Sequence, residues 1–453
     1  MRRLVTMTLL VAAITVDAQS PAMRERLSGT VRAINGTPEE FEAYAKDAFA
    51  KTLFDKETPE QRRKLFVSIR TEYGTLTPGR AARESPTQVR LSVIGTKKSG
   101  DLMIAHEVEP PHRITSLSIE ASGGDAPAQA TASRAAATTE ERMRDVDKYV
   151  WPLTQTGTFS GVVLVARDGV PVFQKGYGLA DREKNVANTA DTRLNVGSIN
   201  KQLTRVVLAQ LAAAGKLSLD DPVEKHLPDY PNVDGRRTTI RQLVTHQGGV
   251  ADWYDDGDFV RGPKSRFRSN RDFYRIVASK PLRFSPGSKT EYCNACFVVL
   301  GEIIERIAGM SYERVAQERV LTPAGMADSG FFQIDRPQPR MAIGYTRDGA
   351  RGLVPNVTRR GAGGNAAGGA FMTAKDLLAF EQAIRGRRLM DEKWTAWFLD
   401  NRPQMFFGGG GDGVSAALLG DGRWTVVAMA NLDTPAGSSV AKALFSMLTR
   451  DPA

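Results

Sequence analysis

A serine and a lysine three residues apart could form an acylating site. Ser198 and Lys201 stand in the segment NVGSINKQLTR, at the start of an apolar run. Residues at i and i+3 share one face of a helix, so the two side chains would lie one turn apart. A neighbouring base makes a serine hydroxyl nucleophilic, and a lysine becomes such a base when burial lowers its pKa. The spacing therefore points to acyl transfer, with Ser198 as nucleophile and Lys201 as base.

The same spacing also has a purely structural explanation. Serine is a favourable N-cap, and the apolar residues that follow recur at helical intervals until Gly215, a typical helix stop. Ser439 and Lys442 repeat the spacing elsewhere in the chain. The motif alone leaves a capped helix and a catalytic serine both open.

A histidine base is a second possibility for Ser198. Only His226 and His246 lie in the larger part of the chain, and the segment lacks the second glycine of a G-x-S-x-G turn. A Ser-His-Asp triad would have to be recognised by its geometry in space.

A tyrosine and an amide could complete a serine–lysine site. Tyr292 and Asn294 lie in the segment SPGSKTEYCNACF, directly before an apolar stretch that predicts a helix. The tyrosine could relay protons, and the amide could hold a substrate carbonyl. Taken alone, the two residues would also suit a helix entry, because asparagine caps well and tyrosine packs well. The same pattern recurs at Tyr230 and Asn232, in a proline-bearing turn.

The elements that must position these residues follow an α/β pattern. Two apolar hairpins have Asp168-Gly169 and Asp421-Gly422 at their turns. Between them lie the helix that starts near Ser198 and a helix with the stripe Leu300, Ile303, Ile304 and Ile307, and a last helix is expected at about 438–449.

The sequence divides into four segments. Residues 1–18 have two arginines, an apolar stretch and a small-residue end, as in a secretory signal peptide. Residues 19–121 predict a small α+β domain, with a helix in TPEEFEAYAKDAFAKTLF and strands in QVRLSVIG, DLMIAHEVE and HRITSLSIE. Residues 122–138, rich in Ala, Gly, Ser and Thr, predict a linker. The larger domain, 139–453, would open on a helix with a capping box of Thr138 and Glu141.

Composition excludes some functions. The 453-residue chain has a net charge of +10, but the charges are scattered and no nucleic-acid recognition motif appears. No segment after residue 18 approaches the length of a transmembrane helix. Because residues 1–18 resemble a signal peptide, we expect an exported protein, periplasmic or secreted. We therefore expect neither a nucleic-acid partner nor an integral membrane segment.

Two cysteines, Cys293 and Cys296, flank Asn294. In an exported protein they could pair, and a C-x-x-C motif could be redox-active in a thioredoxin-like setting. A zinc site would need more thiolate or histidine ligands, and no histidine follows His246. The state of the two thiols is open, and neither a metal nor an organic cofactor is expected.

From about residue 141 to the end, the chain resembles the serine β-lactamase and penicillin-recognising hydrolases, closest to the class C β-lactamase and esterase branch. NVGSINKQLT resembles the nucleophile segment, TIRQLVTHQGGVADW the next landmark and SPGSKTEYCNACFVVLGEIIERIAGMSYE the Tyr-x-Asn block. ERVLTPAGM and GNAAGGAFMTAKDLLAF also fit, in the order of the family. The resemblance implies an α/β (α+β) fold of two lobes, with an antiparallel sheet flanked by helices beside a mostly helical lobe. The small first domain resembles cystatin-like or nuclear-transport-factor-like domains.

The resemblance also implies a role for each motif residue. Ser198 would be acylated, Lys201 would activate it, and Tyr292 would act with Lys201 in acylation and help to activate water afterwards. Asn294 would hydrogen-bond the substrate. The backbone N–H groups of Ser198 and Gly410 would form the oxyanion hole, where each donor contributes about 3 kcal/mol.

The third motif of the family departs from the usual pattern here. A Lys- or His-led triplet lines the cleft in relatives, and the matching residues here are Phe407, Gly408 and Gly409. Phenylalanine cannot bind a substrate carboxylate, although the glycines that follow let a ligand approach the backbone. This departure favours an ester or amide substrate that lacks such a carboxylate over a β-lactam. The expected activity is that of a hydrolase for an ester, an amide such as a D-amino-acid peptide, or a β-lactam. The alternative is a catalytically silent protein that binds cell-wall peptide or another acyl ligand, in an oligomeric state that the sequence leaves open.

Overall fold

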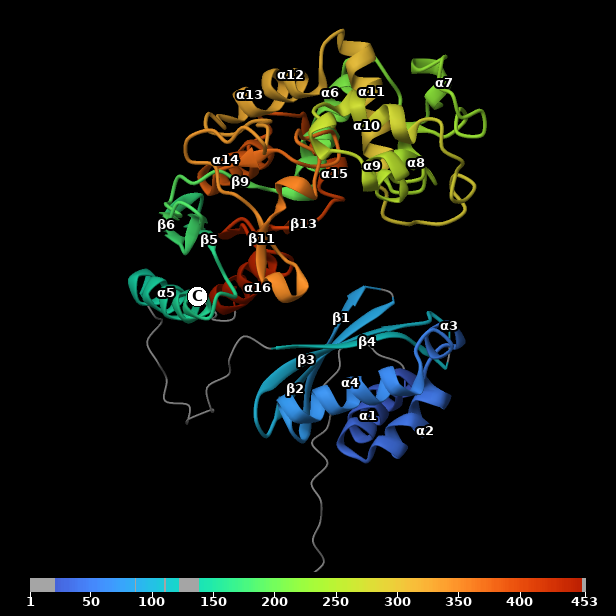
Figure 1. Ribbon diagram of the computed structural model, residues 1–453, viewed down its shortest axis with the longest axis vertical. Coiled ribbons are helices and arrows are strands. Elements are labelled where there is room, and N and C mark those ends of the chain that lie inside the picture. The colour runs from blue at the N-terminus through green and yellow to red at the C-terminus, as the bar shows by residue number, and fades with distance from the viewer. Residues whose placement is uncertain (1–20, 86, 110, 122–137, 450–453) are drawn as a thin grey trace, which may run out of the picture. The chain divides into compact units, whose positions relative to one another are not determined.

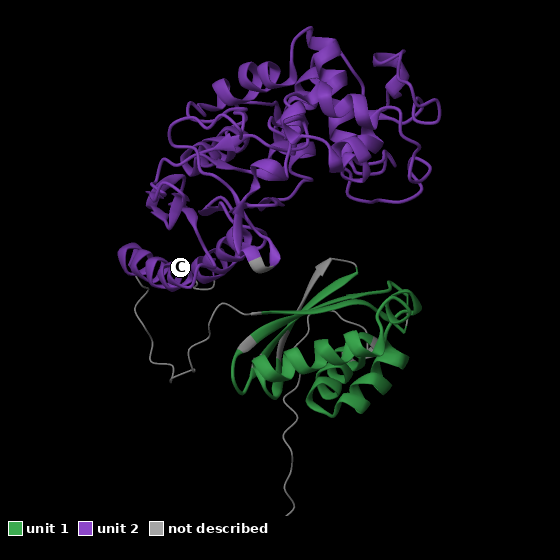
Figure 2. Ribbon diagram, in the orientation of Figure 1, with its two compact units in different colours: residues 1–133 green, residues 134–453 purple. Residues whose placement is uncertain are grey.

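The computed structural model describes residues 21–85, 87–109, 111–121 and 138–449, which form two compact units (Figures 1 and 2). One unit lies within residues 1–133 and the other within 134–453. The predicted signal peptide, 1–18, and the predicted linker, 122–138, lie outside the described residues except for Thr138.

The first unit packs helices on an antiparallel four-stranded sheet with strand order β1-β2-β3-β4. The predicted strands are present as β2, β3 and β4, and the predicted helix is present as α2 and α3. Helices α1 and α4 and strand β1 were not expected. The elements are α1 (Pro21–Asn35), α2 (Pro38–Ala48), α3 (Lys51–Phe54), α4 (Pro59–Tyr73), β1 (Leu76–Ser85), β2 (Gln88–Gly95), β3 (Ser99–His106) and β4 (Ile114–Ala121). The cystatin-like or nuclear-transport-factor-like assignment stays a prediction.

The second unit is built on a five-stranded antiparallel sheet with strand order β13-β14-β15-β5-β6. Both predicted hairpins are present, and Asp168 and Gly169 have positive φ angles at the first turn. The strands are β5 (Gly161–Arg167), β6 (Val170–Tyr177), β13 (Met405–Gly411), β14 (Val414–Gly420) and β15 (Trp424–Ala430). Strand β13 is one of the two edge strands, so one of its edges is left without a strand partner.

Side chains alternate between the two faces of this sheet. Val163 and Val165 pack toward α5 and α16 on one face, whereas Val162 and Leu164 join the main core on the other. The principal helices are α5 (Thr139–Gln155), α6 (Lys201–Ala213), α10 (Asn270–Val277), α11 (Asn294–Ala308), α14 (Ala374–Arg385), α15 (Glu392–Phe398) and α16 (Ala436–Thr449). An antiparallel sheet flanked by helices, beside a mostly helical lobe, confirms the predicted fold class.

Shorter elements connect the sheet to the helices. The short strands are β7 (Leu179–Asp181), β8 (Val186–Ala187), β9 (Leu194–Asn195), β10 (Tyr345–Arg347), β11 (Leu353–Pro355) and β12 (Phe371–Met372). The short helices are α7 (Val223–His226), α8 (Ile240–Val244), α9 (Gly257–Arg261), α12 (Tyr312–Ala316) and α13 (Thr322–Ala324). Within the described ranges, no helix is both long enough and apolar enough to cross a bilayer.

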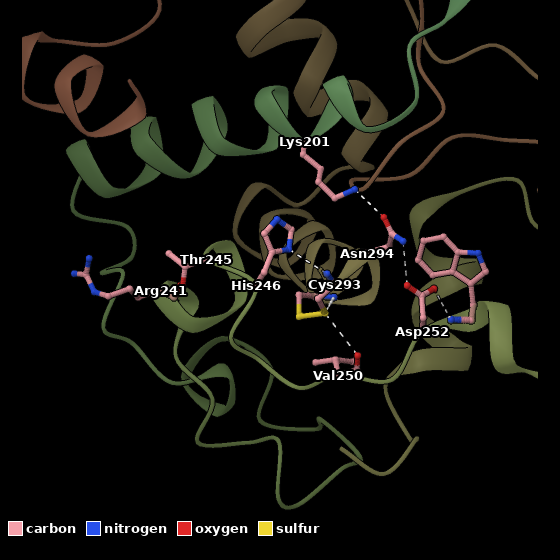
Figure 3. Close-up of a disulfide and its surroundings, with 10 residues drawn as sticks. Lys201, Arg241, Thr245, His246, Val250, Asp252, Cys293 and Asn294 are labelled. Atoms are coloured by element: carbon pink, nitrogen blue, oxygen red, sulfur yellow. Dashed lines mark hydrogen bonds between the residues drawn. A yellow bond between two sulfur atoms is a disulfide. The ribbon is translucent and has the colours of Figure 1, made fainter. Parts of the chain in front are cut away.

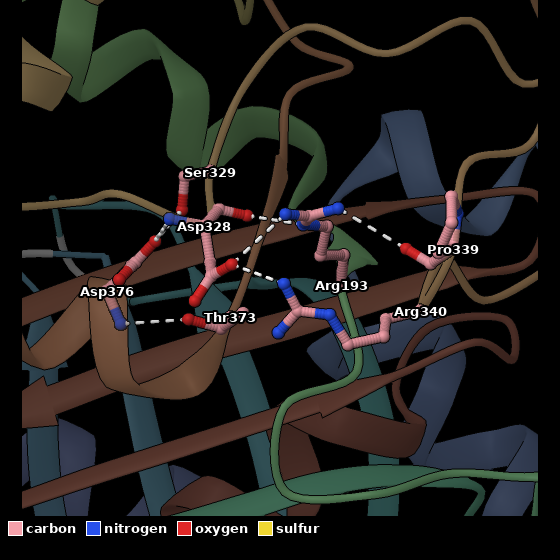
Figure 4. Close-up of polar contacts among 7 residues, drawn as sticks. All are labelled: Arg193, Asp328, Ser329, Pro339, Arg340, Thr373 and Asp376. Atoms are coloured by element: carbon pink, nitrogen blue, oxygen red, sulfur yellow. Dashed lines mark hydrogen bonds and ion pairs between the residues drawn. The ribbon is translucent and has the colours of Figure 1, made fainter.

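A polar network holds the chain just before the serine segment (Figure 4). Arg193 donates to the carbonyl of Asp328 at 2.7 Å and to its carboxylate at 3.0 Å. Asp376, near the start of α14, accepts hydrogen bonds from the backbone of Asp328 and from the Ser329 hydroxyl. Because Arg193 precedes β9, which pairs with β12, the network fixes the strand that delivers Ser198.

Candidate active site

Ser198 lies in a 3₁₀ turn, Gly197–Asn200, that runs directly into α6. It does not cap the helix, because the N-cap residue of α6 is Asn200 and no side chain makes a capping bond there. The Ser198 hydroxyl instead contacts Lys201 Nζ at 3.1 Å and Tyr292 Oη at 2.5 Å. The structural explanation for this serine is therefore wrong, and its oxygen is held by the two other residues of the predicted site.

The 3₁₀ turn packs backbone to backbone against the edge strand β13. A Cβ atom on Gly197, whose φ angle is +52°, would stand 2.8 Å from the nitrogen of Gly410. A Cβ atom on Gly409 would collide with the carbonyl oxygen of Val196 and stand 2.8 Å from the nitrogen of Ser198. Glycine at both positions brings the backbone of Gly410 beside that of Ser198, the pair predicted to form the oxyanion hole.

A single methyl group at residue 409 is expected to disrupt this arrangement. Gly409→Ala should lower kcat/KM by about 10²-fold, because a displacement of about 1 Å in a reacting group has that effect. The measurement is hydrolysis of a chromogenic ester. Gly408→Ala is the matched control, since a Cβ atom there meets only the Phe406 ring, at 3.6 Å. Equal rates for the two variants would contradict the backbone packing.

Lys201 is buried in the first turn of α6, with 3% of its surface exposed. Its Nζ atom has three neighbours at hydrogen-bond distance, the Ser198 hydroxyl, Asn294 Oδ1 at 2.8 Å and the Ala367 carbonyl at 2.8 Å. Burial lowers the pKa of Lys201 to about 7, partly offset by the charge of Asp252. A large fraction of the side chain is therefore neutral near neutral pH.

The three contacts suit a neutral lysine that acts as a base. A neutral amine has two N–H donors and one lone pair. Asn294 Oδ1 and the Ala367 carbonyl can only accept, so they take both donors. The lone pair then faces the Ser198 hydroxyl, the remaining contact, and can receive its proton.

Tyr292 completes the contacts of the Ser198 hydroxyl from the segment before α11. Burial raises the pKa of Tyr292, so its hydroxyl stays protonated and donates to Ser198 Oγ. The ring stacks on His246 with centroids 4.8 Å apart. Burial and the charge of Lys201 lower the pKa of His246 to about 4, and its Nδ1 accepts the N–H of Cys293. His246 is therefore neutral and orients Tyr292.

Asn294 links Lys201 to an acidic residue that sequence reasoning missed (Figure 3). While Asn294 Oδ1 accepts from Lys201, its Nδ2 donates to Asp252 Oδ2 at 3.1 Å. The other oxygen of Asp252 accepts the N–H of Trp253 at 2.8 Å. These bonds fix the orientation of the Asn294 amide and place a carboxylate behind the lysine, where its charge favours the protonated ammonium form.

Removing the charge of Asp252 is expected to move the pH profile of the reaction. In Asp252→Asn the pKa of Lys201 should fall further, so the acid limb of kcat/KM should shift to lower pH. The test is kcat/KM between pH 5 and 9. Asp256→Asn is the control, because Asp256 caps α9 and pairs with Lys280. An unchanged limb in Asp252→Asn would contradict the coupling.

Cys293 and Cys296 form a disulfide at the first turn of α11 (Figure 3). Cys293 lies between Tyr292 and Asn294, and its backbone N–H donates to His246. The link therefore fixes the segment from which both site residues project. This pairing settles the state of the two thiols that the sequence left open.

Ser198, Tyr292, Asn294 and Gly410 line one cavity of about 460 Å³ in the second unit. Aromatic side chains contribute to its lining, and so does a glycine-rich segment, residues 361–369. That segment is fixed to α6, because Asn200 and Thr204 donate to the carbonyls of Asn365 and Ala366. The other lining residues on the aromatic and glycine-rich sides are Trp253, Tyr254, Phe259, Phe273, Gly361, Gly363, Asn365, Ala367, Gly368 and Gly369.

The predicted substrate contact at Phe407 is wrong. Its side chain is 7% exposed and packs against Phe380 of α14 and Phe398 of α15. Side chains of a strand alternate, and this position of β13 faces the core, where burial of an aromatic ring is favourable. Gly408 and Gly409 are not among the lining residues either, and of the four predicted positions on β13 only Gly410 reaches the cavity.

The histidine alternative has no support in the described residues. His226 contacts Asp221 at 2.9 Å, His246 contacts Cys293, and neither is among the hydrogen-bond partners of the Ser198 hydroxyl. Across the described ranges, no group of acidic, histidine and cysteine side chains has the arrangement of a metal site.

Residues 136–449 match the family model described as Beta-lactamase. The chain is 31% identical over 257 residues to a protein of Bacillus subtilis named penicillin-binding protein PbpX, covering 56% of this chain and 62% of that one. It is also 31% identical over 257 residues to a D-aminopeptidase of Brucella anthropi, covering 56% and 47%. The chain thus spans less than two thirds of the length of either relative.

A solved structure has the same fold. The penicillin-binding protein from Bacillus halodurans superimposes with a TM-score of 0.60 and 26% sequence identity. The match covers 66% of this chain and 98% of that chain.

Proposed function

Because the chain belongs to the beta-lactamase family of serine hydrolases, we propose that it cleaves an ester, an amide or a β-lactam through an acyl-enzyme on Ser198. The observation that carries the proposal is the set of contacts around Lys201. Two fixed acceptors occupy the donors of the neutral amine and leave its lone pair facing the Ser198 hydroxyl.

Acylation begins with transfer of the Ser198 proton to Lys201. The freed oxygen attacks the substrate carbonyl, and the negative charge forms on the carbonyl oxygen. The backbone N–H groups of Ser198 and Gly410 are the donors placed to stabilise that charge. Tyr292, whose hydroxyl lies 2.5 Å from Ser198 Oγ, is placed to pass a proton to the leaving group, which departs as alcohol or amine.

Deacylation uses the same groups in the reverse roles. Tyr292, left deprotonated by its transfer to the leaving group, removes a proton from a water molecule that enters the cavity, while Lys201 still holds the proton taken from Ser198. The hydroxide attacks the acyl carbon, the same backbone donors stabilise the oxyanion, and the Ser198 oxygen leaves with a proton returned from Lys201. The acid product is released, and the site is restored.

The nature of the leaving group belongs to the proposal as well. The relative from Brucella anthropi is named a D-aminopeptidase, which supports an amide of a D-amino-acid peptide as one substrate class. The relatives named penicillin-binding proteins support a β-lactam as an acylating probe.

The test is covalent labelling of the folded protein with a fluorophosphonate and, separately, with benzylpenicillin, read by intact mass and peptide mapping. We expect one adduct, located on Ser198. Reaction with the fluorophosphonate alone would indicate a general esterase, and reaction with penicillin would indicate a penicillin recogniser. No adduct with either probe would exclude the acyl-enzyme and leave a catalytically silent binding protein.

We also propose that the protein is exported. The composition of residues 1–18 supports this, although they lie outside the described residues. The Cys293–Cys296 disulfide supports it too, because such bonds persist in oxidising compartments. Mass analysis of the N-terminus of the protein recovered from its source cells would test the cleavage after residue 18.

A further inference from the structure

Two arginines that are neighbours in sequence line the catalytic cavity, but their charges are not equally compensated. Arg359 pairs with Asp348 at 2.7 Å, and Asp348 also pairs with Arg351. Arg360 is half-buried and has no hydrogen bond or ion pair with any other residue that the structure describes. The cavity therefore contains a guanidinium group, that of Arg360, whose donors are not used by any of the described residues.

Arg360 lies beside the expected oxyanion hole. A side chain in place of Gly411 would collide with the Arg360 guanidinium, which puts that group against the last residue of β13. The preceding residue, Gly410, has its nitrogen close to Gly197 and lines the same cavity as Ser198. A group held by Arg360 would thus be only a short chain away from a carbonyl positioned on Ser198.

The chemistry of this group selects its ligand. A guanidinium presents paired N–H donors that match the two oxygens of a carboxylate, and such pairs are stronger in a partly enclosed site than in water. Phe407, at the position where relatives carry a lysine or histidine, is buried in the core and cannot supply a positive charge. Asp412 also lines the cavity, but no ion pair joins it to Arg360 among the described residues.

We propose that Arg360 binds a carboxylate of the substrate and that this protein prefers anionic acyl substrates. The inference rests on the proposed hydrolase function and assigns its substrate class. It replaces the expectation, drawn from Phe407, that the substrate lacks a carboxylate. Arg360 stands in the loop before the glycine-rich segment. Because it can bind the carboxylate from there, a charged residue at position 407 is not needed.

The test compares two pairs of ester probes that differ in charge. In the first pair, 4-nitrophenyl glutarate carries a carboxylate on the acyl part, and 4-nitrophenyl valerate does not. In the second, 4-acetoxybenzoate carries it on the leaving group, and its methyl ester does not. The quantity measured is the ratio of kcat/KM for the anionic probe to that for the neutral probe.

In Arg360→Met this ratio should fall by at least about tenfold in one of the pairs, because a charge-assisted bond is lost. Arg360→Lys should keep part of the ratio, since it retains the charge but not the paired donors. Arg351→Met is the matched control, because it removes one positive charge from the same loop outside the cavity lining. Its ratio should equal that of the wild type.

The outcomes show where on the substrate the carboxylate lies and whether Arg360 binds it. If Arg360→Met lowers the ratio of kcat/KM values in the first pair of probes, the carboxylate belongs to the acyl part. If it lowers the ratio in the second pair, the carboxylate belongs to the leaving group. Unchanged ratios in both pairs, with turnover retained, would overturn the role of Arg360 and leave the hydrolase proposal intact. If the wild type turned over none of the four probes and Ser198 formed no adduct with a fluorophosphonate, the hydrolase proposal itself would fail, and this inference with it.

Discussion

Ser198→Ala is expected to lower kcat for ester hydrolysis by at least about 10⁴-fold, the largest effect of any single change in this chain. The nucleophile is the atom that becomes acylated, and neither Lys201 nor Tyr292 replaces it, because both serve to move the proton of the serine hydroxyl that they contact. The oxyanion donors and the cavity remain, so a small residual rate above that in water is expected. The measurement is steady-state hydrolysis, together with the loss of the mass adduct.

The chain itself provides a control for this experiment. Ser439 and Lys442 have the same spacing as Ser198 and Lys201, but both are exposed on α16. Ser439→Ala should therefore retain the wild-type rate and the adduct. Full activity in Ser198→Ala, or loss of activity in Ser439→Ala, would show that the wrong serine has been assigned.

Lys201→Met is expected to have the second largest effect, a loss of about 10²- to 10⁴-fold in kcat/KM, because the general base is removed. The wild-type rate should fall as the pH drops below about 7, where Lys201 becomes protonated. The variant should lack this dependence. A pH profile of the two proteins between 5 and 9 tests both statements, and an inflection near 7 that persists in the variant would contradict the assignment.

The same lysine also links stability to pH. Its pKa is about 7 in the folded protein and about 10.4 in an unfolded chain, so between these values the unfolded state binds more protons. The wild type should therefore gain stability relative to Lys201→Met as the pH rises from about 7 toward 10. Denaturant unfolding at pH 7 and pH 9.5 measures the difference. The opposite sign would mean that Lys201 is charged when folded.

Sequence patterns predicted most of the second unit because its elements have strong local signals. The two hairpins have turn residues that tolerate positive φ angles, and the apolar stripe of α11 ends at Gly309, a left-handed C-cap. The order of the motifs predicted the family, which the match over residues 136–449 confirms. Helix α1 and strand β1 of the first unit were missed.

The candidate site was predictable only where a motif covers it. Ser198, Lys201, Tyr292 and Asn294 come together as their motifs implied, but Phe407 was misplaced, because a strand does not reveal which of its faces meets the core. The three-dimensional partners of the site lie far from it in sequence. Asp252 could have been found as an acidic residue in the HQGGVADW block. Arg360 could have been found as a second arginine immediately before a glycine-rich segment.

The backbone packing between the serine turn and β13 has an evolutionary consequence. The contacts that bring Gly410 beside Ser198 involve main-chain atoms and the absence of side chains at Gly197 and Gly409. No side-chain atom of residue 407 takes part in those contacts, so selection on the oxyanion donors makes no direct demand on that side chain. The position is thus free to exchange a ligand-binding role for a structural one, and a lineage can acquire a new substrate preference through a different loop while its acylation chemistry is inherited unaltered.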